Sequence, residues 1–305
     1  MDTLLLVLTN SIGGSTYPAN AVMLRGFSHG DALFVRTGLC ALLFLPILWR
    51  ARRRIAALSR GDWLLIGGVS SLGYALPLGL GNYGQTLSTS SSAALFIGME
   101  PVSIVVLSCL LLGERMTVLK ALSMAAGLAG AALIAFQGPP HFGERVGGRL
   151  AGDLVLASAG CCWALYTVLG KPVLERVDPL EYTALTSALC FLGVAAWTAP
   201  GLTPSTWAKA GTGPWLAIFY LAAVGSFLGA LIWNVALRRV EPSRQANSIF
   251  LQPVVGVALG AGLLGDPLTR WTAAGGALVL AGMWAATRSE RAAPAPRAEP
   301  EPVAG

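Results

Sequence analysis

Glu100 is the one acidic side chain that falls deep inside an apolar stretch of this chain. The other acidic residues near such stretches lie at their ends: Asp31, Asp62, Asp153 and Glu181. An ionised carboxylate at the centre of a bilayer costs about 2.5–3.5 kcal/mol, so Glu100 is expected to face the interior of a helix bundle. There it either binds a proton or a cationic group, or stays neutral and hydrogen-bonded and only packs helices together.

Arg36 is the candidate cation for the same interior. It lies about one turn inside an apolar stretch at 31–49, and its depth differs from that of Glu100 by about five residues, or ~7 Å at 1.5 Å per residue. Its long side chain could therefore pair with Glu100 or meet the carboxylate of a substrate. The alternative is that it extends to the outer lipid headgroups, as long cationic side chains do near a membrane surface.

Pro101 and Pro253 predict a bend near the middle of two helices. Proline has no N–H and its ring clashes with the carbonyl group four residues earlier, which belongs to Ile97 and Ile249 respectively. Interrupted helices at matching positions of two halves are the best sequence indication of a transport site. We therefore treat both prolines as candidate hinges; a packing kink without a ligand is the alternative.

Further polar and aromatic side chains inside the apolar stretches predict a polar cavity, because lipid does not tolerate so many of them. Taken singly, each more simply serves as a contact between helices, although an aromatic ring at mid-depth can also stack on a cation. The candidate cavity residues are Gln252, Asn10, Ser11, Tyr74, Asn82, Trp163, Tyr166, Asn234 and Asn247.

Several chemistries have no residues to support them. The chain has no phosphate-binding glycine loop, no nucleophile elbow and no histidine pair at metal-ligand spacing. We therefore expect no enzymatic activity, no cofactor and no metal site, and no nucleic-acid partner.

The composition requires most of the surface to face lipid. Apolar residues make up 54% and charged residues 12% of the chain, about half the charge of a soluble domain. Long apolar runs without alternation are read as membrane-spanning helices. We count ten such stretches, at about 3–24, 31–49, 63–84, 90–112, 118–137, 152–170, 182–199, 214–237, 246–264 and 271–287. The predicted fold is an all-α integral membrane protein with ten transmembrane helices.

The two halves of the chain repeat each other at an offset of 152 residues. Sixteen of the forty positions in 91–130 are identical to their partners in 243–282, and the candidate helix N-caps Thr117 and Thr269 coincide. Because each half holds an odd number of stretches, the second half must cross the membrane in the opposite sense, as in many secondary transporters.

The predicted organisation follows from this repeat. Residues 1–137 form the first five-helix repeat, 138–151 an external linker, and 152–287 the second, inverted repeat. The Pro- and Ala-rich residues 288–305 are expected to be a disordered cytoplasmic tail.

Lysine and arginine residues set the expected orientation. Of 21 such residues, 15 lie in the tail and in the loops at 50–62, 113–120, 171–181 and 238–245. The positive-inside rule therefore places both termini in the cytoplasm, with the chain in the cell (inner) membrane. The start of the chain lacks a positive n-region, so we expect no cleavable signal.

The paired segments MEPVSIVVLSCLLLGERMT (99–117) and LQPVVGVALGAGLLGDPLT (251–269) resemble the EamA-type transporters of the drug/metabolite transporter superfamily. The resemblance covers about residues 3–287 and implies the ten-helix architecture and the export of amino acids, other small metabolites or drugs. One departure is Gly265-Asp266-Pro267, where the family usually shows Gly-Glu-Arg.

Together these patterns favour a secondary active or facilitative exporter of a small metabolite, working by alternating access. An amino acid or related zwitterion is the first choice of substrate, with its ammonium group at Glu100 and its carboxylate at Arg36; coupling to protons at Glu100 and the oligomeric state stay open. The alternatives are export of cationic or lipophilic drugs, a nucleotide-sugar carrier, and a non-transporting membrane scaffold.

Overall fold

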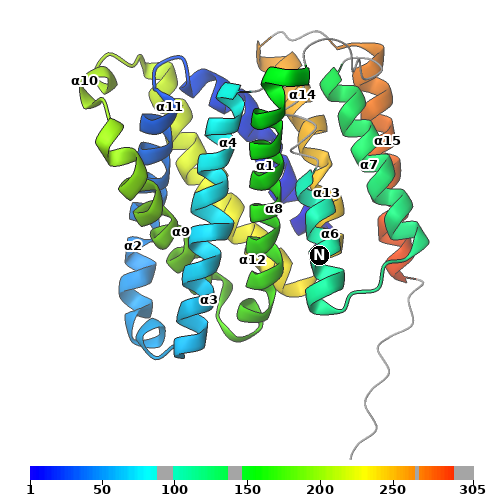
Figure 1. Ribbon diagram of the computed structural model, residues 1–305, viewed down its shortest axis with the longest axis horizontal. Helices are drawn as coiled ribbons and strands as arrows, with labels where there is room; N and C mark the ends of the chain where they lie inside the picture. The colour runs from blue at the N-terminus through cyan, green and yellow to red at the C-terminus, as the bar shows by residue number, and fades with distance from the viewer. Residues whose placement is uncertain (88–98, 137–145, 265–267, 292–305) are drawn as a thin grey trace, which may run out of the picture.

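The computed structural model describes residues 1–87, 99–136, 146–264 and 268–291, and every regular element in these ranges is a helix (Figure 1). The elements of the first half are α1 (Asp2–Met23), α2 (His29–Ala56), α3 (Arg60–Ser70), η1 (Ser71–Ala75), α4 (Leu76–Leu87), α6 (Met99–Leu112) and α7 (Val118–Phe136). Those of the second half are α8 (Val146–Arg176), α9 (Pro179–Thr198), η2 (Ala199–Gly201), α10 (Pro204–Trp207), α11 (Thr212–Tyr220), η3 (Leu221–Leu228), α12 (Gly229–Arg239), α13 (Pro242–Ile249), α14 (Leu251–Leu264) and α15 (Arg270–Arg291).

Helices dominate because the chain carries long apolar runs that satisfy their own backbone hydrogen bonds in lipid. Within the described residues, six helical segments are long and apolar enough to cross a membrane: His29–Ala56, Arg60–Gly81, Leu154–Arg176, Pro179–Gly201, Thr212–Arg239 and Pro242–Leu263. Two further apolar helices, Met99–Leu112 and Val118–Ile134, are shorter. The all-helical architecture with several apolar spans is confirmed, whereas the full number of ten crossings stays a prediction.

The helix boundaries differ from the prediction at the start of the second half. Helix α8 begins at Val146, not at 152, so part of the predicted linker is helical. The rest of that linker, and most of the predicted tail, lie outside the described residues.

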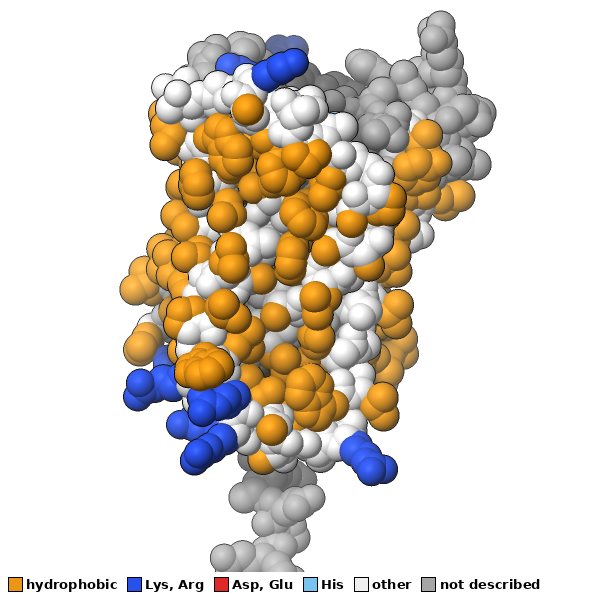
Figure 2. All heavy atoms as spheres, turned by 90° about the vertical axis from the view of Figure 1, so that its left-hand side faces the viewer, with side chains coloured by type: hydrophobic (Ala, Val, Ile, Leu, Met, Phe, Trp, Pro, Cys, Tyr) orange, Lys and Arg blue, Asp and Glu red, His pale blue; other side chains and the backbone are white. Residues whose placement is uncertain are grey.

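The flank of the bundle is covered by apolar side chains, with Lys and Arg side chains at its ends (Figure 2). On α2 and α3, Leu42, Leu45 and Leu64 are 63%, 57% and 79% exposed. Such exposure of leucine side chains over a continuous face indicates contact with lipid.

One end of the bundle, called the basic end below, carries Arg52, Arg53 and Arg54 at the end of α2. Two ion pairs join elements there: Arg54 contacts Glu181 of α9 at 2.8 Å, and Arg176 of α8 contacts Asp62 of α3 at 2.6 Å. Their exposed arginine side chains make each pair a small contribution to stability. The pairs do show that these four helix ends lie together.

The fifth long helices of the two halves, α7 and α15, run antiparallel against each other. A Cβ atom on Gly130 would lie 2.6 Å from the Gly275 carbonyl oxygen, and one on Gly282 would lie 2.9 Å from the Ser123 carbonyl oxygen. Exchanging the halves by 152 residues converts the first contact into the second. As the position on α7 rises from 123 to 130, its partner on α15 falls from 282 to 275. These equivalent helices are therefore related by a two-fold axis, as two inverted repeats require.

The repeated threonines serve the same local function in both halves. The Thr117 hydroxyl accepts a hydrogen bond from the Lys120 backbone N–H at 3.1 Å, and the Thr269 hydroxyl accepts one from the Thr272 N–H at 3.3 Å. Both are N-caps of the following helix, which confirms the prediction. Just before α7, Gly113 adopts a φ of +70°, a left-handed conformation that glycine accepts at little cost and that ends α6.

We predict that Gly130→Ala destabilises the protein by about 1–3 kcal/mol, because the added methyl group forces the α7 and α15 backbones apart. Thermal unfolding in detergent, followed by tryptophan fluorescence, measures the effect. Gly68→Ala is the matched control, since no atom lies within 4 Å of the position its Cβ would take. A melting temperature of Gly130→Ala equal to that of the control would contradict the close antiparallel contact.

Candidate functional site

A cavity of about 440 Å³ lies between the two halves of the bundle. Its walls come from α1, α2, η1, α4, α8, α9, η3 and α12, with single residues from α6 and α14. The lining residues of α1 run from Thr9 to Met23, followed by Leu24 just beyond the helix, and those of α2 run from His29 to Cys40. The cavity therefore extends from the middle of the bundle to the α1–α2 connection, where His29 is exposed. This connection lies at the end opposite the basic end.

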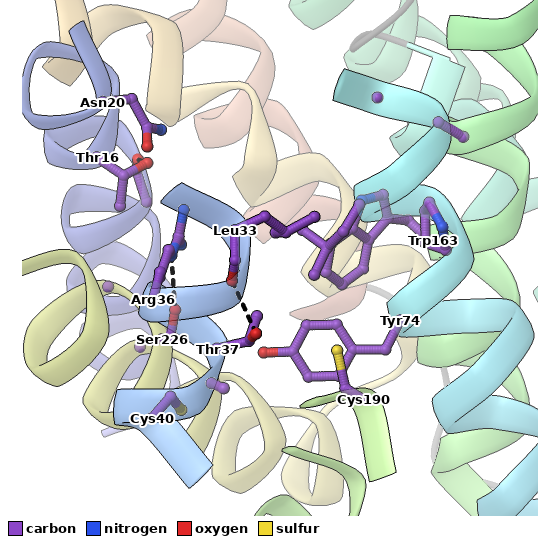
Figure 3. Close-up of a pocket in the computed structure, with 18 of the residues that line it drawn as sticks. Thr16, Asn20, Leu33, Arg36, Thr37, Cys40, Tyr74, Trp163, Cys190 and Ser226 are labelled. Atoms are coloured by element: carbon purple, nitrogen blue, oxygen red, sulfur yellow. Dashed lines mark hydrogen bonds between the residues drawn. The ribbon is translucent and has the colours of Figure 1, made fainter. Parts of the chain in front are cut away.

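Arg36 lies on one wall of this cavity and is held by Ser226. Its Nε donates a hydrogen bond of 2.9 Å to the Ser226 hydroxyl, while Thr16 and Asn20 of α1 lie beside it (Figure 3). Ser226 is 6% exposed and belongs to η3. Because Nε is already engaged, the two terminal nitrogens of the guanidinium group stay available for a bidentate contact with a carboxylate.

Glu100 lies in the first turn of α6 and lines the same cavity. Among the described residues it forms no ion pair, and Tyr17 of α1 lines the same cavity. The direct pair with Arg36, one of the two interior roles expected for that arginine, is thus absent from the described structure. Arg36 does face the interior and does not extend to the headgroups.

Tyr74 and Trp163 lie across the cavity from Arg36 (Figure 3), and Tyr166 also lines the cavity. The ring centroid of Tyr74 lies 5.2 Å from that of Trp163 and 5.3 Å from that of Tyr166. Such edge and tilted arrangements stabilise one another and keep the rings in place. The wall offers a rigid apolar surface next to the polar groups of Arg36 and Glu100.

Some of the predicted amide side chains line the cavity, and others only join helices. Gln252 lines the cavity and donates a 2.9 Å hydrogen bond to the Asn10 Oδ1, while the Asn10 Nδ2 donates to the Ser248 hydroxyl at 2.7 Å. Asn10 itself is fully buried away from the cavity, so it joins α1 to α13 and α14. Close approach is possible because Gly13 has no side chain: a Cβ there would lie 2.8 Å from the Gln252 side chain.

Asn234 also joins helices and does not line the cavity. Its Nδ2 donates to the Tyr166 hydroxyl at 2.8 Å and to the Thr183 hydroxyl at 2.9 Å, which ties α12 to α8 and α9. Ser11 and Asn247 likewise lie off the cavity, and the side chain of Asn82 lies outside what the structure describes. Of the predicted set, the cavity brings together Glu100, Arg36, Gln252, Tyr74, Trp163 and Tyr166.

Helix interruption is found at one of the two predicted hinges. Helix α13 ends at Ile249, and α14 begins at Leu251 with Pro253 in its first turn. The helix is therefore interrupted at Phe250, directly after the residue whose carbonyl group Pro253 cannot bond. Pro101 is buried in the first turn of α6, and Ile97 lies outside the described residues. That either proline acts as a hinge stays a prediction.

Two π-helical segments occupy matching positions in the two halves. Shifting η1 (Ser71–Ala75) by 152 residues places it inside η3 (Leu221–Leu228), and both segments face the cavity, η1 with Tyr74 and η3 with Ser226. In η1 the cause is visible in the sequence, because Pro77 cannot donate to the Gly73 carbonyl. We have no comparable cause for η3. Such wide turns are frequent at functional sites.

Comparison with known proteins agrees with this geometry. The helical bundle with a central cavity is that of a membrane transporter, and the chain belongs to the EamA-like transporter family, which matches residues 2–136 and 150–288. One solved structure is similar over 95% of this chain and 98% of its own, with a TM-score of 0.78 at 19% identity. That similarity shows the shared fold.

Several relatives are named as transporters. The uncharacterized transporter YyaM of Bacillus subtilis is 26% identical over 90% of this chain and 89% of its own length. A probable terminal-alkyne amino-acid exporter of Streptantibioticus cattleyicolor is 28% identical over 91% and 90%. A probable amino-acid metabolite efflux pump of Salmonella typhimurium is 32% identical over 44% and 48%.

Proposed function

We propose that this transporter exports a small amino acid or related zwitterion by alternating access, with an apolar side chain on the substrate. The carboxylate of the substrate binds the terminal nitrogens of Arg36, and its ammonium group binds Glu100. The side chain lies against Tyr74 and Trp163. In this proposal both termini lie in the cytoplasm, because lysine and arginine gather at the basic end.

The observation that carries the proposal is the pair of opposite charges in one cavity without an ion pair between them. Arg36 has a hydroxyl partner and Glu100 has no cationic partner among the described residues. Both are costly to bury in a membrane protein unless something compensates them. A zwitterion satisfies both at once and adds no net charge to the cavity.

The size and lining of the cavity agree with such a substrate. A volume of about 440 Å³ falls in the range of small-molecule sites, which are mostly apolar with a few placed polar groups. The names of the amino-acid exporter and efflux-pump relatives support the same substrate class. The rival substrate, a lipophilic cation, would use Glu100 and the aromatic wall but would leave Arg36 without a function.

Glu100 also supports an exchange with protons. In the empty cavity a bound proton can compensate the Glu100 carboxylate, and the ammonium group of an arriving substrate can replace that proton. Substrate and proton therefore compete for one group, which is what coupled exchange requires. The direction of transport then follows the gradients of both.

For the carboxylate contact we predict that Arg36→Gln raises the KM for an apolar amino acid such as leucine by about 10- to 100-fold, since it removes a charged hydrogen-bonding partner. The measurement is counterflow of radiolabelled leucine in proteoliposomes. Arg25→Gln is the matched control: Arg25 lies near the same end of the bundle, exposed and off the cavity. Equal KM values in the two variants would reject the proposed contact, and transport of a cationic dye without leucine counterflow would favour the rival substrate.

For the coupling we predict that Glu100→Gln removes the stimulation of leucine transport by an imposed pH gradient, because an amide does not titrate. Counterflow without a gradient should persist at a higher KM. Both activities are measured in the same proteoliposome preparation. If the variant responds to the gradient as the parent protein does, Glu100 is not the coupling group.

A further inference from the structure

Lys120 joins the two halves of the chain at the basic end. This residue lies in the first turn of α7, and its Nζ donates to the Glu241 carboxylate at 2.8 Å and to the Ser243 hydroxyl at 2.9 Å. The Glu114 carboxylate lies 3.5 Å from the same nitrogen. Lys120 and Glu114 belong to the first half, whereas Glu241 and Ser243 belong to the second.

The contact is mostly removed from water, so its loss has a measurable cost. The Lys120 side chain is 10% exposed and that of Glu114 is 7%, although that of Glu241 is 59%. A cation in that setting needs its partners, because separating the halves would remove Glu241 and Ser243 from Lys120 and leave it with Glu114 at 3.5 Å. This differs from the exposed arginine pairs at the same end, which contribute little.

The cavity does not reach this end of the bundle. Asp2, at the start of α1, lies 3.9 Å from Arg239, which precedes the Lys120 partner Glu241 by two residues, whereas the lining of α1 begins only at Thr9. A buried apolar cluster, called the inner plug below, combines residues of both halves. Its buried members are Ile104, Val105, Ala164, Val168, Ala246 and Ile249. Along α13 and α14 two of its members, Ala246 and Ile249, lie between Ser243, which contacts Lys120, and Gln252, which lines the cavity.

The contact has no equivalent lysine in the other half. Exchange of the halves converts Lys120 into Thr272, which cannot form an ion pair. The partner of Glu114 is Asp266, which lies outside the described residues. The lysine-centred contact is therefore specific to the basic end, where the cavity is closed.

We propose that Lys120, with Glu241, Ser243 and Glu114, forms an interhalf lock that keeps the transporter closed at the basic end. The inner plug closes the path sterically, and the lock holds the start of α13 against the start of α7. Opening toward the basic end requires the Lys120–Glu241 contact to break, so the lock sets the balance between the two orientations of the cavity. The proposal rests on alternating access and not on the identity of the substrate.

The test measures access to the cavity from the basic side. In a cysteine-free background, Ala230→Cys places a reporter thiol on the cavity wall, and oriented proteoliposomes are treated with a charged, membrane-impermeant thiosulfonate from either side. Lys120→Met should increase the labelling rate from the basic side several-fold and lower the rate from the opposite side. The labelling assay needs no substrate, so it tests the lock even if the proposed substrate is wrong.

Lys171→Met is the matched control. Lys171 is a partly buried lysine at the same end whose Nζ donates to the carbonyl oxygens of Leu237, Arg238 and Val240 of the second half at 2.8, 3.1 and 3.1 Å. Glu114 and Glu241 act on it only through their charge and accept no hydrogen bond from it in the described structure. We expect Lys171→Met to change the labelling rates much less than Lys120→Met does, because the hydrogen bonds and ion pair across the halves stay in place. Equal rates in the Lys120 and Lys171 variants would overturn the lock.

A second variant keeps the test valid if Lys120→Met fails to fold. Glu241→Gln removes the charge from the exposed partner of the same contact. The variant should fold, because the Glu241 side chain is largely exposed. It should shift labelling in the same direction by a smaller factor. Unchanged labelling in folded Glu241→Gln, with Lys120→Met unable to fold, would also reject the lock.

Discussion

The structure depends on one constraint: charged and polar side chains buried in a membrane protein must be compensated, because lipid offers no hydrogen bonds. Arg36 and Glu100 meet it by facing a cavity, and Asn10 and Asn234 meet it by hydrogen bonding across helices. The two halves enclose the cavity that Arg36 and Glu100 face. The lined cavity, which we propose as the binding site, and the close contacts between helices are therefore two outcomes of the same physical requirement.

The two halves have the same helical framework, and the charged groups lie at positions where their sequences differ. The two halves pack their equivalent helices α7 and α15 against each other through equivalent contacts, and each half has a π-helical turn at the cavity wall. At the matching positions Glu100 and Gln252, however, one half carries a carboxyl group and the other an amide that is hydrogen-bonded to Asn10. One side of the cavity can thus carry charge while the other serves packing. The basic end shows a similar difference between the halves: Lys120 of the first half is replaced by Thr272 at the equivalent position of the second.

Much of this architecture could be predicted from the sequence. Apolar runs indicate the helices, the 152-residue repeat indicates the halves, and Thr117 and Thr269 mark two helix starts. Depth in the membrane also follows, which is why Glu100 and Arg36 could be placed near one another. What the sequence cannot supply is the rotation of each helix about its axis: Asn10 and Asn234 have the right depth but face other helices, whereas Ser226, the partner of Arg36, sits in a π-helical turn with no local sequence cause. For the equivalent π-helical turn η1, in contrast, Pro77 is a sequence feature from which the turn could have been predicted.

The central claim is that Arg36 and Glu100 together recognise a zwitterion. Isothermal titration of the purified transporter with leucine, with its amine lacking the carboxylate, and with its acid lacking the amino group tests this directly. Each missing group removes a charged contact, so the amine and the acid should each bind at least about tenfold more weakly than leucine. If the amine binds as tightly as leucine, Arg36 does not recognise a carboxylate and the account fails.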